Sequence, residues 1–185
     1  MIPGSVPLAC LLLFATVSVS SATPADSEFA EGQRLASTGA FEESIGHWKK
    51  AELLFEQEKN LFGQCEAELQ LAAAYNSLGR INLAIETLDK VQEKAARQHD
   101  LKHLAAAKAA LGAIYTLGSP PMSNMNHHDE MGKNEDEAQS NLRESVKLAR
   151  LAKDSQTEAV ALNNLGNLHS YQNKFDIAEE EYRTA

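Results

Sequence analysis

The sequence is poor in the residues that most often mark chemistry or unusual backbone geometry. Its 185 residues include two cysteines, five prolines, ten glycines and one tryptophan, and aromatic residues make up 6% of the chain. So few glycines and prolines exclude a collagen-like or low-complexity protein, and so few cysteines exclude a disulfide-rich scaffold. β-branched residues are also sparse while alanine and leucine abound, which favours helices over sheets.

Basic residues are fewer than acidic residues. Lys and Arg number 17 against 26 Asp and Glu, so the formal net charge at pH 7 is −9 and the isoelectric point is about 5.1. A chain this acidic repels phosphate groups. We therefore expect no nucleic-acid partner and no binding to an anionic membrane surface.

The N-terminus carries one apolar run. Residues 6–19 are 14 consecutive apolar or small residues, which is shorter than the roughly 20 needed to span a bilayer. Ser20-Ser21-Ala22 follows and suits the last positions before a signal-peptidase cut, so residues 1–22 are predicted to be a signal peptide of a secreted or periplasmic protein. No Lys or Arg precedes the run, and the alternative is a buried or membrane-associated N-terminal helix.

Catalytic and cofactor motifs are absent. Cleavage of the signal would remove Cys10 and leave Cys65 alone on a predicted helix, where we expect it to be a packing residue. The sequence contains no phosphate-binding loop, no dinucleotide-binding glycine pattern and no zinc-ligand spacing. We therefore expect no enzyme activity, no cofactor and no structural metal.

An internal repeat organises the rest of the chain. A turn residue is followed two places later by an aromatic or aliphatic residue and five places later by a small one. The pattern begins at Gly39, Gly79 and Asn173, and a weaker copy begins at Lys133. The first two and the last two starts share one separation of about 40 residues, within the range that is typical of solenoid proteins. The middle interval is longer, and a single insertion before Lys133 restores the phase.

Each unit has the pattern of two packed helices. A small residue precedes each turn and would let a partner helix approach closely. These residues are Gly32, Ala72, Gly112 and Gly166. In the second unit we predict a first helix over residues 64–78, ended by Gly79, and a second over residues 81–96. Ser155 and Glu158 have the spacing of a capping box at the start of the fourth unit.

The run from Leu165 to Ala178 (LGNLHSYQNKFDIA) resembles a tetratricopeptide (TPR) repeat. That family combines a small-residue pattern, a turn, and then an aromatic residue followed by alanine, at a basic period of about 34 residues. The resemblance implies an all-α fold, a right-handed α-solenoid of about four antiparallel helical hairpins over residues 23–185. The longer period of this chain is similar to that of arrays placed before the caspase-like CHAT domain in bacterial proteins.

The units would cover about residues 27–60, 61–100, 101–154 and 155–185, with the last unit cut short at Ala185. The third unit has Glu135 where an aromatic or aliphatic residue is expected, so we predict that its hairpin is splayed or loosely packed.

The insertion, residues 119–133, is predicted to be an exposed loop because Pro120-Pro121 stops the preceding helix. Between residues 122 and 131 it carries three methionines and two histidines, which could bind Cu(I) or Zn(II). The alternative is a flexible polar excursion, since nothing fixes the geometry of these ligands. We assign no metal site here. His99 and His103 are four places apart but straddle an expected helix start, so we do not expect them to form a pair.

The resemblance implies a function in binding rather than chemistry. In the TPR family the first helices of the hairpins line a concave groove, where asparagines can hydrogen-bond the backbone of a ligand. The matching residues are Asn163 and Asn167, and the polar surface extends to Asn164, Ser170, Tyr171, Asn76 and Gln33. Small residues, among them Ala73, Ala109 and Ala113, form an apolar floor. The alternative is that the asparagines only solvate a helix.

We therefore predict a protein-interaction scaffold that binds a peptide or a partner helix. The alternative function is the regulatory N-terminal part of a larger CHAT protease-type protein.

Overall fold

The computed structural model describes residues 22–117 and 127–185, with the side chains of 127–133 left out. In this part of the chain the secondary structure consists of eight α-helices without strands, which confirms the expected all-α class. The helices are α1 (Pro24–Ser37), α2 (Phe41–Gln57), α3 (Leu61–Ser77), α4 (Ile81–Gln98), α5 (Leu101–Thr116), α6 (His127–Ala152), α7 (Ser155–Tyr171) and α8 (Phe175–Thr184).

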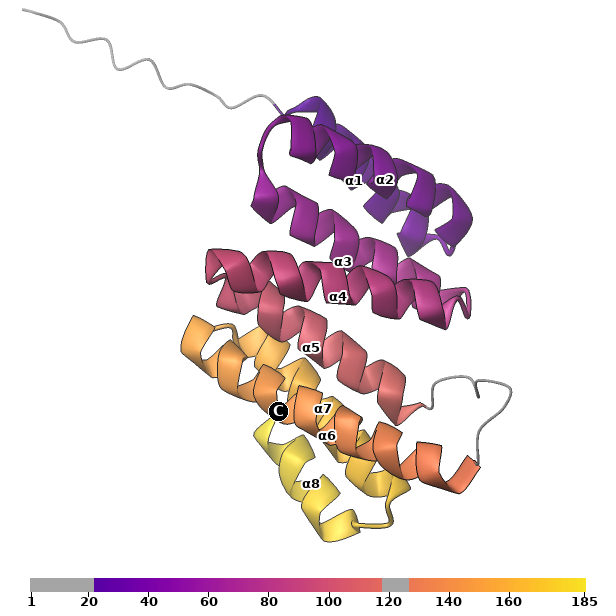
Figure 1. The fold of residues 1–185 in the computed structure, drawn as a ribbon, viewed down its shortest axis with the longest axis vertical. Coiled ribbons are helices and arrows are strands. Elements are labelled where there is room, and N and C mark those ends of the chain that lie inside the picture. Colours follow the sequence, from indigo (N-terminus) through magenta and orange to yellow (C-terminus); the bar gives the residue numbers. More distant parts are fainter. Residues whose placement is uncertain (1–21, 118–126) are drawn as a thin grey trace, which may run out of the picture.

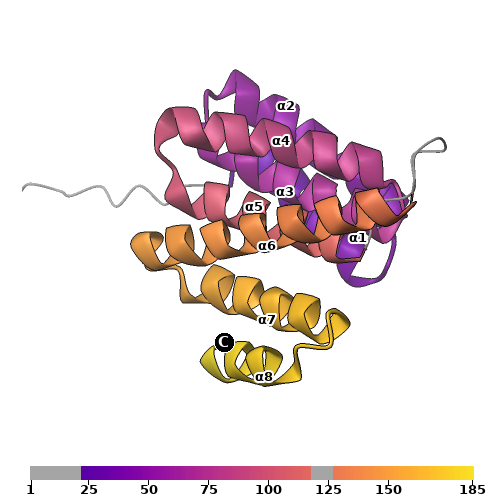
Figure 2. The same cartoon turned by 60° about the horizontal axis from the view of Figure 1, so that its bottom comes forward.

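The helices are stacked in chain order along the long axis of the molecule (Figure 1). Each helix packs against the next one, and α5 also packs against both α3 and α7. Figure 2 shows α6, α7 and α8 following one another at the C-terminal end of the stack. Thus α3, α5 and α7 form a continuous row, which is the arrangement that positions the site described below.

Left-handed residues mark most of the helix ends. Within the described ranges, six residues with left-handed backbone, at φ between 56° and 81°, lie just after a helix: Gly39, Lys59, Gly79, His99, Lys153 and Asn173. A left-handed residue at this point reverses the chain and lets its amide satisfy a carbonyl of the last turn. Gly79 ends α3, as predicted. The alternate turns at Lys59, His99 and Lys153 carry no glycine, so the sequence pattern did not mark them.

Three helices begin with a side-chain cap directly after these non-glycine turns. Asn60, Asp100 and Asp154 each accept a hydrogen bond from the backbone N–H of the residue three places later. Such caps satisfy amides that have no partner within the helix. The first helix of the second unit therefore begins at Leu61, earlier than the predicted start at residue 64, and its partner α4 ends at Gln98 rather than at residue 96.

The predicted capping box of the fourth unit is wrong. Asp154, not Ser155, is the cap of α7, because its Oδ1 accepts a hydrogen bond of 3.2 Å from the backbone N–H of Thr157. Ser155 is already the first helical residue. Glu158 lies one position too late to reach back to the cap, and it pairs instead with Arg150 at 2.6 Å.

Glycines and bulky residues face each other between paired helices, as the small-residue pattern predicted. A Cβ placed on Gly32 would lie 2.5 Å from the indole of Trp48. A Cβ on Gly112 would lie 2.4 Å from Leu142, and one on Gly166 would lie 2.5 Å from Tyr182. Because these contacts leave no room for a methyl group, glycine sets the close approach of these three helix pairs.

The third unit is not splayed, contrary to the expectation from Glu135. Ala138 and Leu142 are fully buried, and the Ser145 hydroxyl donates a 2.7 Å hydrogen bond to the backbone carbonyl of Ala105. The side chain of Glu135 is tolerated because it is only half-buried, and its Oε2 accepts a hydrogen bond of 2.9 Å from Gln172. A polar partner next to α7 thus replaces the apolar contact that the pattern expects.

The insertion is shorter as a loop than predicted. Since α5 ends at Thr116 and α6 begins at His127, the second half of the insertion is helical. Pro120 and Pro121 disfavour a helix at their own positions, but they precede residues 127–133. These later residues contain no proline and can therefore form the first turns of α6. The methionines and histidines considered as metal ligands lie outside the described residues or side chains, and so does the predicted signal peptide, apart from its last residue, Ala22.

Candidate partner-binding groove

A shallow hollow of about 330 Å³ lies between α5 and α7. Its α5 side consists only of alanines, whereas its α7 side mixes polar and apolar side chains. The lining residues are Ala106, Ala109, Ala110, Ala113, Gln156, Thr157, Val160 and Asn164.

The alanines explain why a hollow forms here. They recur at three- and four-residue spacing, so they share one face of α5. A methyl group is too short to fill the space above the contact between α5 and α7, and Val160 on the opposite side stays 48% exposed. The result is an apolar floor open to solvent, which a partner could cover.

The polar rim of the hollow is held in place by hydrogen bonds. The Thr157 hydroxyl donates to Asp154 Oδ2 at 2.8 Å, which ties the rim to the cap of α7. Burial favours the neutral acid, but the hydrogen bonds from Thr157 outweigh it and hold the pKa of Asp154 below its usual range. Asp154 therefore stays ionised at neutral pH next to the rim residue Thr157, although it does not line the hollow itself.

The predicted groove residues divide into two groups. Asn164, Ala109 and Ala113 line the hollow together, so the alanine floor and one of the asparagines are adjacent as the prediction requires. Gln33 on α1 is exposed, and Asn76 on α3 is half-buried; neither lines it.

The other polar residues of α7 lie away from the floor, and so does Ala73 on α3. Asn167 accepts a 2.7 Å hydrogen bond from the Tyr182 hydroxyl of α8, and the hydroxyl of Ser170 lies 3.5 Å from the same Tyr182 oxygen. Asn163 is exposed, and the Tyr171 side chain is 66% exposed. The Asn167 side chain is exposed, but its oxygen is already engaged by Tyr182.

The sequence analysis missed Gln156, Thr157 and Val160 of α7, which lie opposite the alanines. Val160 could have been predicted from the repeat. It lies six places before Gly166 in the fourth unit, as Ala106 lies six places before Gly112 in the third. Ala106 and Ala110 could have been found from their helical spacing to Ala109 and Ala113.

A buried histidine cluster joins α3 to α5 beside this row and was also missed. His103 is 1% exposed, and its Nδ1 lies 2.5 Å from Asp100 Oδ2 while its Nε2 lies 3.2 Å from Glu66 Oε1. The Phe62 ring packs edge-on against the imidazole at 4.5 Å. His99, by contrast, is exposed at the end of α4, so the two histidines do not form a pair.

The electrostatics of this cluster favour an imidazolium. Burial lowers the pKa of His103, but the hydrogen bonds to Glu66 and Asp100 outweigh it and raise that pKa above its ordinary value. The hydrogen bond from His103 in turn lowers the pKa of Glu66. Both ring nitrogens have partners within the chain, so the cluster is a structural link between helices.

Cys65 is a core residue, as predicted. It is 1% exposed and belongs to the main apolar cluster with Trp48 and Leu88. Burial, followed by the nearby Glu68 carboxylate, raises the pKa of the thiol to about 11, so the reactive thiolate is scarce at neutral pH.

The described residues include no group of three or more His, Cys, Asp or Glu side chains placed to hold a metal ion. Within the same ranges no helix combines the length and the apolar character needed to cross a membrane. Comparison with protein-family models and with curated protein sequences found no match to this chain.

Proposed function

We propose that this protein is a TPR-like scaffold, a right-handed α-solenoid of helical hairpins that binds a peptide or a partner helix along α3, α5 and α7. The observation that carries this proposal is the alanine-floored hollow between α5 and α7, since an exposed apolar floor with a polar rim is what a peptide groove requires. The N-terminal apolar run supports a secreted or periplasmic location.

The proposed mode of binding follows from the chemistry of the lining. An apolar side chain of the partner would fill the space above Ala109 and Ala113, where it would replace water on the floor. The amide of Asn164 at the edge would exchange hydrogen bonds with the partner's backbone. Binding needs no chemical step and no cofactor.

A selected peptide provides the test. We would isolate short peptides that bind the chain from a random display library and measure their affinity for two variants. Ala113→Arg puts a long charged side chain into the hollow, whereas Ala96→Arg makes the same change at an exposed position of α4. We expect Ala113→Arg to weaken binding by at least about tenfold, a loss of about 1.4 kcal/mol. Equal affinities for the two variants would contradict the groove.

A second candidate is the regulatory part of a larger CHAT protease-type protein. The exposed end face of α8 supports it, because Tyr182 is 42% exposed while its repeat equivalents Trp48, Leu88 and Leu142 are at most 2% exposed. A further domain could cover this face. A Cys/His catalytic domain encoded in frame after Ala185 would support this candidate, and a stop codon there would exclude it.

A further inference from the structure

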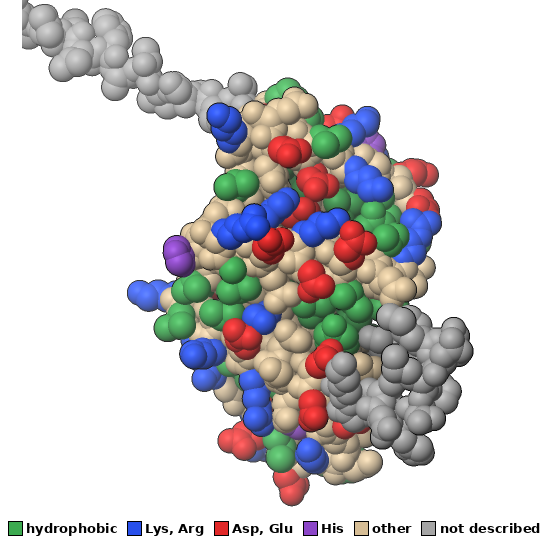
Figure 3. All heavy atoms as spheres, viewed as in Figure 1, with side chains coloured by type: hydrophobic (Ala, Val, Ile, Leu, Met, Phe, Trp, Pro, Cys, Tyr) green, Lys and Arg blue, Asp and Glu red, His purple; other side chains and the backbone are tan. Residues whose placement is uncertain are grey.

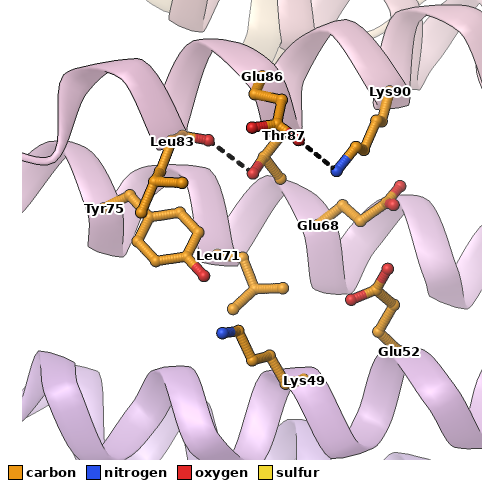
Figure 4. A pocket seen from close by; sticks show the side chains of 9 residues that line it. All are labelled: Lys49, Glu52, Glu68, Leu71, Tyr75, Leu83, Glu86, Thr87 and Lys90. Carbon is orange, nitrogen blue, oxygen red and sulfur yellow. Dashed lines mark hydrogen bonds and ion pairs between the residues drawn. The ribbon is translucent and has the colours of Figure 1, made fainter.

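A second hollow, separate from the proposed groove, lies between α2 and α4 above α3. It has a volume of about 220 Å³ and combines acidic, basic and apolar side chains (Figure 4). The lining residues are Lys49, Glu52, Glu68, Leu71, Tyr75, Leu83, Glu86, Thr87 and Lys90. The surface over this part of the molecule interleaves acidic, basic and apolar groups rather than presenting a patch of one sign (Figure 3).

Glu68 is the unusual residue of this hollow. It is only 2% exposed, and its Oε1 accepts a 2.7 Å hydrogen bond from Lys94, but its buried Oε2 has no partner. A buried carboxylate oxygen without a hydrogen bond is costly, so it marks a place where a donor is missing. The Glu52 carboxylate extends from α2 toward that of Glu68 (Figure 4). Burial and the nearby Glu52 together outweigh Lys94 and raise the pKa of Glu68, so the two acidic groups face each other without a cation from the described residues between them.

In the next unit of the repeat, the equivalent positions form an ion pair between two helices. Lys108 takes the place of Glu68 in that unit, and Glu144 takes the place of Lys90 once the insertion is allowed for, so the two positions carry swapped charges there. Lys108 Nζ lies 2.8 Å from Glu144 Oε2, which links α5 to α6. In the hollow, Lys90 instead pairs with Glu86 at 2.8 Å on its own helix, and Lys94 contacts only the other oxygen of Glu68, so neither lysine faces the free Oε2.

The remaining wall of the hollow suits the stem of a basic side chain. Tyr75, Leu71 and Leu83 provide apolar surface on the side away from Glu52 and Glu68 (Figure 4). The ring of Tyr75 already accepts a cation, because Lys49 Nζ lies 5.9 Å from its centroid. Cations are drawn to the face of such a ring, and guanidinium groups also stack on it.

We propose that this hollow binds the guanidinium group of an arginine side chain presented by a partner protein. The planar fork of guanidinium can donate to two carboxylates at once, here Glu68 through Oε2 and Glu52. The aliphatic stem of the arginine would lie against Tyr75 and Leu71. A divalent metal is the poorer fit, since these carboxylates do not belong to any metal-binding group within the described residues.

The test uses the whole chain and N-acetyl-arginine amide as the probe, with N-acetyl-citrulline amide as its neutral isostere. Chemical-shift changes in two-dimensional NMR spectra would report the site. We expect saturable shifts around Glu52, Glu68 and Tyr75, with a dissociation constant of about 1–10 mM for so small a ligand. Citrulline should produce none of these shifts. No saturation by the arginine probe up to about 50 mM, or equal shifts with both probes, would overturn the proposal.

Three variants locate the site. Glu52→Gln should weaken binding of the arginine probe by about fivefold or more. Glu68→Gln should abolish it if the fold persists, which circular dichroism would establish. Glu93→Gln is the matched control, because Glu93 is an exposed residue of α4 that pairs with Arg97 outside the hollow. Binding that is unchanged in Glu52→Gln would refute the proposed site even if Glu68→Gln does not fold.

Discussion

At the scale of single residues, Trp48 shows how one side chain holds two helices together. It is 2% exposed, its indole nitrogen has no hydrogen-bond partner, and its ring lies directly over Gly32. Trp48→Ala should therefore lower the free energy of unfolding by about 3–5 kcal/mol through lost burial and the resulting cavity. Urea unfolding would measure this, with Leu53→Ala, at a 57% exposed position, as the control. A loss below about 1 kcal/mol for Trp48→Ala would contradict the packing.

Two glycines in helices should respond to alanine in opposite directions. Gly32→Ala would push a Cβ to 2.5 Å from the indole, and overpacking of this kind costs about 1–3 kcal/mol. Gly46→Ala on α2 would meet no atom within 4 Å. This variant should gain about 0.5–1 kcal/mol from helix propensity. Thermal unfolding of both variants would check the pair, and a stabilised Gly32→Ala would count against the close approach of α1 and α2.

The His103 cluster predicts how stability depends on pH. The raised pKa of His103 contributes stability that is present below its ordinary value of 6.5 and is lost as the pH rises through the raised value. The lowered pKa of Glu66 contributes stability that is present above 4.5 and is lost as the pH falls through its lowered value. The cluster should thus stabilise most between about pH 4.5 and 6.5.

His103→Gln should remove the decline in unfolding free energy that the wild type shows above about pH 6.5. Guanidinium unfolding at a series of pH values would measure the two curves. His99→Gln is the control, because His99 is exposed and outside the cluster. Parallel curves for the wild type and His103→Gln would mean that the imidazole is not linked to folding.

Residue roles were predictable where they depend on spacing within one helix pair. The facing of glycine and bulky residues repeats at fixed intervals and could be anticipated, as could the burial of Cys65. The partners of His103 could not, because Glu66 reaches it from another helix. The register between α3 and α5 is needed to bring them together. Glu52 and Glu68 were missed for the same reason.

At the scale of helices, the caps can be tested directly. Asp154→Ala should lower the unfolding free energy by about 1 kcal/mol, because the backbone N–H of Thr157 would lose its acceptor. Ser155→Ala should change it by less than about 0.5 kcal/mol, since Ser155 is an exposed first residue of α7. Chemical unfolding would compare the two variants. A larger loss of unfolding free energy for Ser155→Ala than for Asp154→Ala would instead identify Ser155 as the cap.

Helix identities followed from hydrophobic spacing, but several helix ends did not. Gly79 marked the end of α3 because glycine is the usual left-handed residue, whereas Lys59, His99 and Lys153 take the same conformation without that mark. The start of α6 at His127 was hidden because its first two turns have no apolar periodicity.

At the scale of the whole molecule, the repeat period predicted the row of first helices, and that row exposes the alanine floor of α5. The exact composition of the groove was less predictable. The resemblance to TPR repeats placed Asn163 and Asn167 in the groove, with Asn164 extending the polar surface, yet of these three only Asn164 borders the floor. The lateral offset between α5 and α7 decides this, and a single sequence does not reveal such an offset.

Mapping the contact of a selected peptide on the whole chain is the most direct measurement of the proposed groove. On adding the peptide, we predict that backbone amide shifts in NMR spectra concentrate in two segments, Ala106–Ala113 of α5 and Gln156–Asn164 of α7. In Ala113→Arg the same shifts should need at least about ten times more peptide. Shifts that concentrate on other helices, or shifts of α5 and α7 that saturate at the same peptide concentration in Ala113→Arg, would contradict binding in the groove.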